Sequence, residues 1–76
     1  MLNILTKDQQ GGEVLFKIHS HSRIKLLFDA YAQRNSYQVE SLIFRVKSTS
    51  LYLSYHDGNK TYDECGLQDG ETLTLV

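Results

Sequence analysis

The chain has 76 residues, a net charge of −1 and a single cysteine, Cys65, so we expect one small domain, residues 1–76, without an intramolecular disulfide. Its hydrophobic content of 41% excludes a disordered chain, and a charge so close to zero argues against nucleic acid as a partner. No apolar run approaches the ~20 residues that cross a bilayer, and the first residues lack a signal-peptide layout, so we expect an intracellular protein with no membrane partner.

Two strands joined by a tight turn are predicted at the start of the chain. Apolar and polar residues alternate over residues 2–6 and again over residues 13–19, which is the pattern of strands with one buried face. In the second strand this places Phe16 and Ile18 on the same face. Residues 8–12 include two glycines, which favour a turn because glycine adopts positive φ without strain. We therefore expect an antiparallel hairpin.

The only long helix is predicted over residues 22–34. Ser22 is a favourable N-cap because its hydroxyl can accept a hydrogen bond from an amide of the first turn. Asn35 follows the helix, and asparagine can adopt the left-handed conformation that ends one. Apolar residues recur at the spacing that places them on one helix face, and this face must pack on a sheet. These residues are Ile24, Leu27, Phe28 and Tyr31.

Three further strands are predicted over residues 41–47, 51–55 and 71–76, again from alternating apolar residues. Thr61 and Glu64 have the spacing of a capping box, which predicts a short helix of a single turn, or a 3₁₀ turn, before the last strand. The order of elements is therefore two strands, a helix, two strands, a short helix and a final strand. This order predicts an α+β fold in which one helix packs on a sheet.

Four short segments together form a recognisable pattern. They are Phe-Lys-Ile at residues 16–18, Ala-Tyr and Gln-Arg within residues 30–34, Leu-Ile-Phe-Arg at residues 42–45, and Cys-Gly-Leu-Gln-Asp followed by Glu-Thr-Leu within residues 65–73. These segments are similar to proteins of the ubiquitin superfamily. In order and spacing they resemble the small ubiquitin-related modifiers (SUMO proteins) most closely. The resemblance implies the ubiquitin-like β-grasp fold (ββαββ-short helix-β), a mixed sheet crossed by one helix. It also implies protein partners, namely SUMO-interaction-motif-like peptides and conjugation-pathway enzymes.

Two features depart from the pattern of that family. Conjugated modifiers end in a tail that closes with two glycines, whereas the sequence given ends at Val76, so we expect this form not to be conjugated. The stretch of residues 45–60 is several residues longer than its counterpart in ubiquitin or SUMO proteins. The resemblance therefore does not predict how the fourth strand is arranged.

The resemblance implies a partner-binding groove between the second strand and the helix. In SUMO proteins a short hydrophobic motif adds to this strand, and backbone hydrogen bonds give such binding its affinity. Lys17 and Arg34 could pair with acidic residues beside the motif, and histidines that gain charge near pH 6 would strengthen the binding of an acidic peptide. The alternative is an ordinary edge strand protected by charged residues. The groove residues are Phe16, Lys17, Ile18, His19, His21, Ser22, Leu26, Leu27, Tyr31 and Arg34.

A second candidate surface is the sheet face that carries Ile43. The run Leu-Ile-Phe at residues 42–44 matches the pattern of ubiquitin, in which the middle residue lies in an exposed apolar recognition patch. We expect the last strand to lie beside it. The alternative is an isolated surface hydrophobe, which is common in proteins. The residues of this sheet patch are Ile43, Arg45, Lys47, Thr74 and Val76.

No catalytic constellation is evident in the sequence, so we do not expect an enzyme. Cys65 with His19, His21 or His56 is the only conceivable pairing of a nucleophile and a base. The simpler interpretation of Cys65 is a small core residue, because free cysteines are commonly buried. Two nearby histidines fall short of the roughly four ligands of a structural zinc site, so we expect no metal and no other cofactor.

Three functional hypotheses follow. The first is a monomeric domain that docks non-covalently onto proteins of a SUMO or ubiquitin pathway, in the nucleus or the cytoplasm. The second is a protein modifier whose diglycine tail is missing from the sequence given. The third is a structural domain of a larger assembly, in which Tyr52 and Tyr55 would form an interface because tyrosine is enriched in interface cores.

Overall fold

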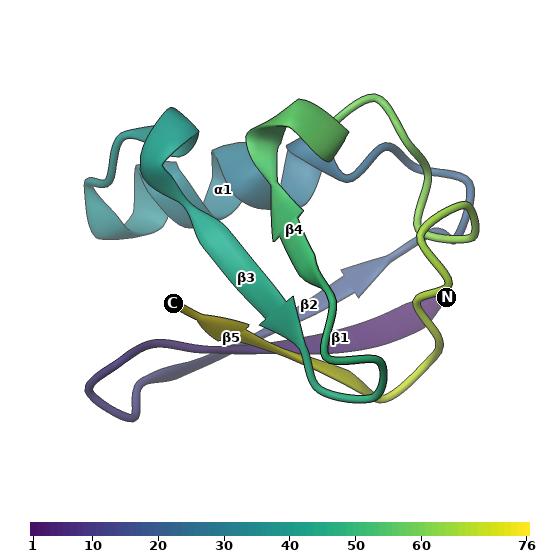
Figure 1. Ribbon diagram of the computed structural model, residues 1–76, viewed down its shortest axis with the longest axis horizontal. Coiled ribbons are helices and arrows are strands. Elements are labelled where there is room, and N and C mark those ends of the chain that lie inside the picture. Colours follow the sequence, from purple (N-terminus) through teal and green to yellow (C-terminus); the bar gives the residue numbers. More distant parts are fainter.

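The computed structural model describes residues 1–76, which form one sheet, one α-helix and two short 3₁₀ helices. Helix α1 lies across one face of the sheet (Figure 1). No helix has the length and the apolar character needed to cross a lipid bilayer. In chain order the elements are β1 (Leu2–Lys7), β2 (Glu13–Ile18), α1 (Lys25–Asn35), η1 (Val39–Ser41), β3 (Ile43–Val46), β4 (Tyr52–Ser54), η2 (Tyr55–Asp57) and β5 (Glu71–Leu75).

The sheet is mixed, with the strand order β2-β1-β5-β3-β4. Strands β1 and β5 pair in parallel, and every other neighbouring pair is antiparallel. The predicted hairpin of β1 and β2 is confirmed, and the Asp8 carboxylate closes its turn by accepting hydrogen bonds from the amides of Gln10 (2.8 Å) and Gly12 (2.7 Å). Strands β2 and β4 remain as the two edges of the sheet.

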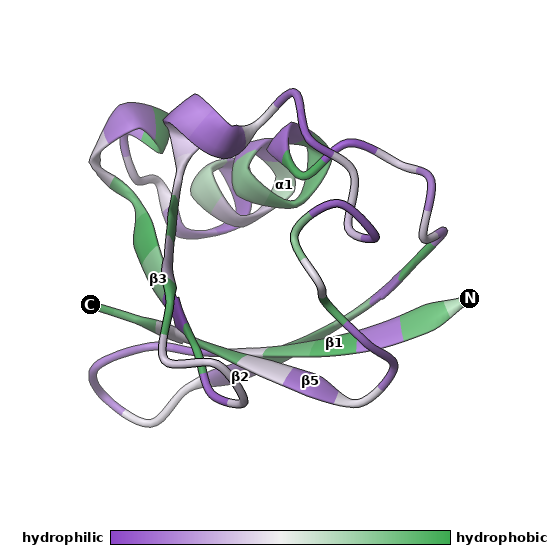
Figure 2. Cartoon of the chain, turned by 45° about the vertical axis from the view of Figure 1, so that its right-hand side comes forward, coloured by the Kyte–Doolittle hydropathy of each residue, from purple (hydrophilic) through white to green (hydrophobic).

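A single hydrophobic core lies between α1 and the sheet, where the hydrophobic stretches of both meet (Figure 2). The ring of Phe44 on β3 lies nearly perpendicular to those of Phe28 and Tyr31 on α1, at centroid distances of 5.4 and 5.1 Å. Such pairs contribute about 0.5–1.5 kcal/mol each beyond the burial of their surface. The predicted inward faces are confirmed. The buried hydrophobic residues are Ile4, Ile24, Leu27, Phe28, Tyr31, Ala32, Leu42, Phe44, Val46, Leu53, Tyr62, Leu67, Leu73 and Leu75.

The start of α1 differs from the prediction. The helix begins at Lys25, and the Ser22 side chain caps none of its amides, so the prediction of Ser22 as N-cap is wrong. The amides of Ile24 and Lys25 instead donate to the carbonyl oxygens of Lys60 (2.9 Å) and Gly58 (3.0 Å). These two backbone donors thus find acceptors in a loop distant in sequence, so they need no side-chain cap there.

The end of α1 lies one residue beyond the position predicted. Ser36, with φ of 60°, adopts the left-handed conformation, and its amide donates to the carbonyl oxygen of Ala32. Asn35 stays helical, because its side-chain amide donates to the carbonyl oxygen of Tyr31 at 3.0 Å. Asn35 therefore stabilises the last turn of the helix instead of ending it in the left-handed conformation.

Strands β3 and β4 are shorter than predicted because a 3₁₀ helix adjoins each of them. Helix η1 occupies the residues before β3, and η2 begins at Tyr55, which was expected to be in the strand. The Ser54 amide donates to the Asp57 carboxylate at 3.0 Å, and the two residues form a capping box that turns the chain out of the sheet. The long stretch at residues 45–60 thus contains the end of β3, the short strand β4 and helix η2.

Residues 61–66 form the single turn predicted there, without a regular helix. Thr61 and Glu64 do make the reciprocal hydrogen bonds of a capping box, at 2.9 Å from the Thr61 amide and 3.2 Å from the Glu64 amide. Gly66 then adopts a φ of 74°, which stops any helix, and the buried Tyr62 side chain anchors the turn in the core. The predicted capping box and the predicted single turn are both confirmed.

The loop that supports the start of α1 provides a stability test. A Cβ atom on Gly58 would lie 2.8 Å from the Lys25 Cβ and 2.9 Å from the Tyr55 carbonyl oxygen. We therefore expect Gly58→Ala to lower the free energy of unfolding by about 1–3 kcal/mol, measured by urea unfolding followed by circular dichroism. The control is Ser22→Ala, which should stay within about 0.5 kcal/mol because Ser22 caps nothing. The reverse ranking of the two variants would contradict the observed helix start.

Candidate functional site

Strand β2 has a free backbone edge. It lies at one end of the sheet and pairs only with β1. At its turn the Asp8 amide donates to the Gly12 carbonyl oxygen at 2.9 Å, which makes these two residues a hydrogen-bonded pair. Such pairs alternate along an antiparallel register, so Leu15 and Lys17 are in the intervening pairs and their amide and carbonyl groups point away from β1. An extended peptide could pair with these groups.

The helix-facing side chains of β2 supply apolar surface beside this edge. Phe16 and Ile18 are half-buried against the core. Leu27 and Tyr31 are only 1% and 2% exposed, so they form the core and are not accessible to a ligand. Both pockets in the structure lie near η2 and β4, so the predicted groove is an open surface. We name it the β2–α1 surface, with the accessible residues Phe16, Lys17, Ile18, His19, His21, Ser22, Leu26 and Arg34.

Basic side chains flank the β2–α1 surface. Lys17, His19 and Arg34 are exposed, and none of them makes an ion pair within the chain. His21 differs, because its Nδ1 lies 3.5 Å from a carboxylate oxygen of Asp63. A positive charge on His21 would therefore be offset locally, whereas a charge on the other three is available to a partner.

The side chains of Leu26 and Arg34, the two accessible helix residues of this surface, point away from α1 in different directions. Lys25 borders a small pocket together with Tyr55, so its flank of the helix faces the β4 side. At ~100° per residue, Arg34 falls on the opposite flank, toward β2, and Leu26 falls nearly opposite the buried stripe. Leu26, 56% exposed, therefore lies at the outer margin of the surface and Arg34 lies closer to the strand.

The outer face of the sheet brings the predicted sheet patch together. The Val76 amide donates to the Ile43 carbonyl oxygen at 2.9 Å, and Thr74 lies opposite Arg45 on the neighbouring strand. Ile43 and Val76 are 41% and 57% exposed. Lys47 lies exposed just beyond the end of β3. The patch is thus a contiguous pair of apolar side chains with two cations along β3.

Carboxylates of the C-terminal third hold loops in place. Asp69 accepts hydrogen bonds from the backbone amide (2.7 Å) and the side-chain amide (3.0 Å) of Asn3, and these bonds lower the pKa of Asp69. Hydrogen bonds with Thr61 likewise lower the pKa of Glu64. Glu71, 7% exposed, accepts two hydrogen bonds from the turn between β3 and β4. The acidic excess of this part of the chain therefore has a structural role.

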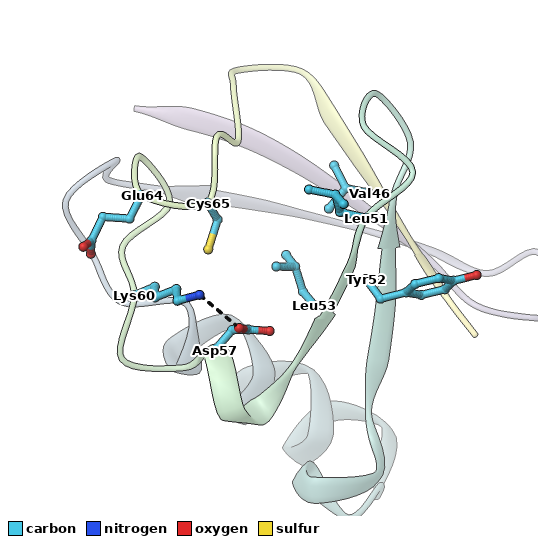
Figure 3. A pocket seen from close by; sticks show the side chains of 8 residues that line it. All are labelled: Val46, Leu51, Tyr52, Leu53, Asp57, Lys60, Glu64 and Cys65. Atoms are coloured by element: carbon cyan, nitrogen blue, oxygen red, sulfur yellow. Dashed lines mark hydrogen bonds and ion pairs between the residues drawn. The ribbon is translucent and has the colours of Figure 1, made fainter.

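A pocket that the sequence did not indicate lies at the other edge of the sheet, beside β4 (Figure 3). Cys65 lines it, and burial raises the pKa of the Cys65 thiol, which favours the neutral form. The chain contains no group of three or more side chains placed to hold a metal ion. We name this pocket the β4-edge pocket, and its lining residues are Val46, Leu51, Tyr52, Leu53, Asp57, Lys60, Glu64 and Cys65.

Comparison with known sequences finds a relative over nearly the whole chain. The chain is 31% identical over 75 residues to small ubiquitin-related modifier 2 of Arabidopsis thaliana, which covers 99% of this chain and 68% of the relative. No protein-family model matches the chain.

Comparison with solved structures finds the same architecture in three ubiquitin-like proteins. A designed protein based on ubiquitin has a TM-score of 0.78 at 19% identity, covering 99% of this chain and 85% of that one. The ubiquitin-like domain of an Arabidopsis thaliana protein has a TM-score of 0.82 at 9% identity, with 99% and 74% coverage. The C-terminal ubiquitin-like domain of mouse tubulin-specific chaperone e has a TM-score of 0.78 at 9% identity, with 97% and 82% coverage. The predicted β-grasp fold is confirmed.

The loop carboxylates predict an acid-dependent loss of stability. Because folding lowers the pKa of Asp69 and Glu64 below their ordinary values of 3.8 and 4.5, the stability they contribute is present above those values and is lost as the pH falls through the folded-state pKa. We expect the free energy of unfolding to decrease from about pH 5 to about pH 3, and Asp69→Asn to flatten this decrease. The control is Glu40→Gln, which removes a carboxylate without a hydrogen bond. An equal slope in Asp69→Asn and in the parent, measured by urea unfolding, would contradict the assignment.

Proposed function

Because this chain belongs to the family of small ubiquitin-related modifiers, as its sequence resemblance predicted, we propose that it is a non-enzymatic module that docks non-covalently onto other proteins through the β2–α1 surface. The observation that carries the proposal is the free backbone edge of β2 beside apolar and basic side chains. The proposed partners are extended hydrophobic motifs with acidic flanks and enzymes of a SUMO or ubiquitin pathway, in the nucleus or cytoplasm.

The energetics of this surface favour a short extended ligand. The amide and carbonyl groups of Leu15 and Lys17 can form hydrogen bonds to an added strand, each with a net contribution of about 0.5–1.5 kcal/mol. Micromolar affinity corresponds to about 8 kcal/mol, so apolar contacts with Phe16 and Ile18 must supply much of the remainder. The basic side chains then select ligands with acidic flanks and increase the rate of encounter.

The sheet patch is the second candidate site, favoured by the contiguous exposure of Ile43 and Val76.

A different alternative is covalent modification of other proteins, the role that the name of the plant relative states. It would be supported by a gene product that continues past Val76 to a diglycine. The interface hypothesis for Tyr52 and Tyr55 is weakened, because Tyr55 is half-buried against Phe28 at a centroid distance of 6.1 Å, whereas Tyr52 is 61% exposed.

An NMR titration distinguishes the candidate surfaces. The ¹⁵N-labelled chain is titrated with an acetylated peptide that carries aliphatic residues and an acidic flank. We expect chemical-shift changes on the amides of residues 13–22 and on the first and last turns of α1. Changes confined to Ile43, Thr74 and Val76 would instead support the sheet patch. The absence of changes at millimolar peptide would contradict docking through either surface.

Charge reversal tests the role of the basic flank. We expect Lys17→Glu to weaken binding of the acidic peptide by about five-fold or more, because an exposed ion pair contributes up to about 1 kcal/mol and the reversal adds repulsion. Lys47→Glu is the matched control, since Lys47 is also exposed but lies three strands away in the sheet. Fluorescence anisotropy of the labelled peptide measures both affinities. An equal loss in the two variants would show that only the net charge matters.

A further inference from the structure

Strand β2 carries an apolar side chain on the outer face of the sheet as well as on the face toward the helix. Phe16 and Ile18 pack toward the core, so Leu15 between β-neighbours of that face points to the outer side, where it is 55% exposed. Leu15 lies outside the groove that the resemblance predicted. A strand that pairs with β2 therefore meets apolar surface on both of its own faces.

Leu15 is continuous with a second apolar side chain of the outer face. Leu5 on β1 lies directly opposite Leu15, and partners in register point to the same face of a sheet. Counted from the hydrogen-bonded pair of Asp8 and Gly12, the two leucines fall in a non-hydrogen-bonded pair, in which side chains lie closest to each other. They form an apolar pair that ends at the free edge of the sheet.

The register of an added strand places one of its side chains beside Leu15. The amide and carbonyl groups of Leu15 point to the open edge. The ligand residue opposite Leu15 has its side chain on the outer face, about 5 Å away, whether the ligand runs parallel or antiparallel. The ligand residues before and after it point to the other face, beside Val14 and Phe16.

The charges on the outer face of β2 fix where an acidic ligand residue is attracted. Lys17 lies two residues from Leu15, about 7 Å along the same face, and makes no ion pair within the chain. On the other side of Leu15, the Glu13 carboxylate lies 3.4 Å from the Lys7 ammonium, which offsets its charge. An acidic ligand residue is therefore favoured on the Lys17 side, two residues from the one beside Leu15.

We propose that Leu15 is a specificity-determining residue of the β2 edge, which selects a partner segment with three consecutive aliphatic residues next to an acidic residue. The middle aliphatic residue contacts Leu15 on the outer face, and the acidic residue lies beside Lys17. The two other aliphatic residues face the helix side. This inference rests on the function proposed above and adds a preference to it, because a segment with a polar residue in the middle position loses the contact with Leu15.

The test compares two acetylated, fluorescently labelled peptides in anisotropy titrations with the 76-residue chain. One contains Glu-Val-Val-Val-Glu, and the other has threonine, which is close to valine in shape, in place of the middle valine. The two glutamates permit binding in either strand direction. We expect the valine peptide to bind about two- to five-fold more tightly, as for other cross-strand apolar pairs. Leu15→Thr should remove this difference and leave the affinity for the threonine peptide nearly unchanged.

Leu51→Thr is the matched control, because Leu51 is a 61% exposed leucine beside the opposite edge strand and its loss should preserve the preference. Amide spectra of the free variants verify that each remains folded. If both peptides bind the parent chain equally, or if the preference persists in Leu15→Thr, the role of Leu15 is overturned while docking on β2 stands. If neither peptide binds, this inference and the function proposed above are both overturned.

Discussion

The contact of Phe44 with Phe28 and Tyr31 determines how the helix sits on the sheet. Phe44 lies on β3 with a fully buried side chain, and two aromatic rings of α1 meet it nearly edge-on. Because one residue of the sheet contacts two successive turns of the helix, it fixes both the distance and the direction of α1. The loop at Gly58 and Lys60 then meets the first turn of that helix and supplies its backbone acceptors. Strands β2 and β4 are the outermost strands of the sheet, so each has one backbone edge that pairs with no other strand.

The buried faces were predictable from the sequence, whereas several boundaries were not. Because successive side chains of a strand point to opposite faces of the sheet, the local sequence is enough to place Phe44 inward and Ile43 outward, whichever strand lies beside them. The start of α1 depends on carbonyl groups more than thirty residues away, which no local pattern contains. The same limit applies to capping boxes, because the Ser54–Asp57 pair and the Thr61–Glu64 pair have the same spacing but only the first begins a 3₁₀ helix.

In the candidate site, too, features set by the local sequence were predictable and features set by tertiary contacts were not. The resemblance predicted the β2 surface and its cations and also assigned Leu27 and Tyr31 to the groove, but the helix periodicity assigned these two residues to the core, and the structure buries both. The β4-edge pocket had no signal at all, because its walls come from residues as far apart as Val46 and Cys65. In the structure the carboxylates of Asp57 and Glu64 accept hydrogen bonds from nearby backbone amides.

The parallel pairing of β1 with β5 constrains how the molecule acquires its shape. Ile4 lies opposite Glu71, so the interior of the sheet joins segments from the two ends of the sequence. During synthesis on a ribosome, the hairpin and the helix emerge long before the strand that must lie between β1 and β3. Contacts of such long sequence separation slow folding, and the apolar faces of the early segments stay exposed in the meantime. The nascent chain is therefore expected to stay unfolded until its last strand has left the exit tunnel, which makes that period the one in which chaperones have access to it.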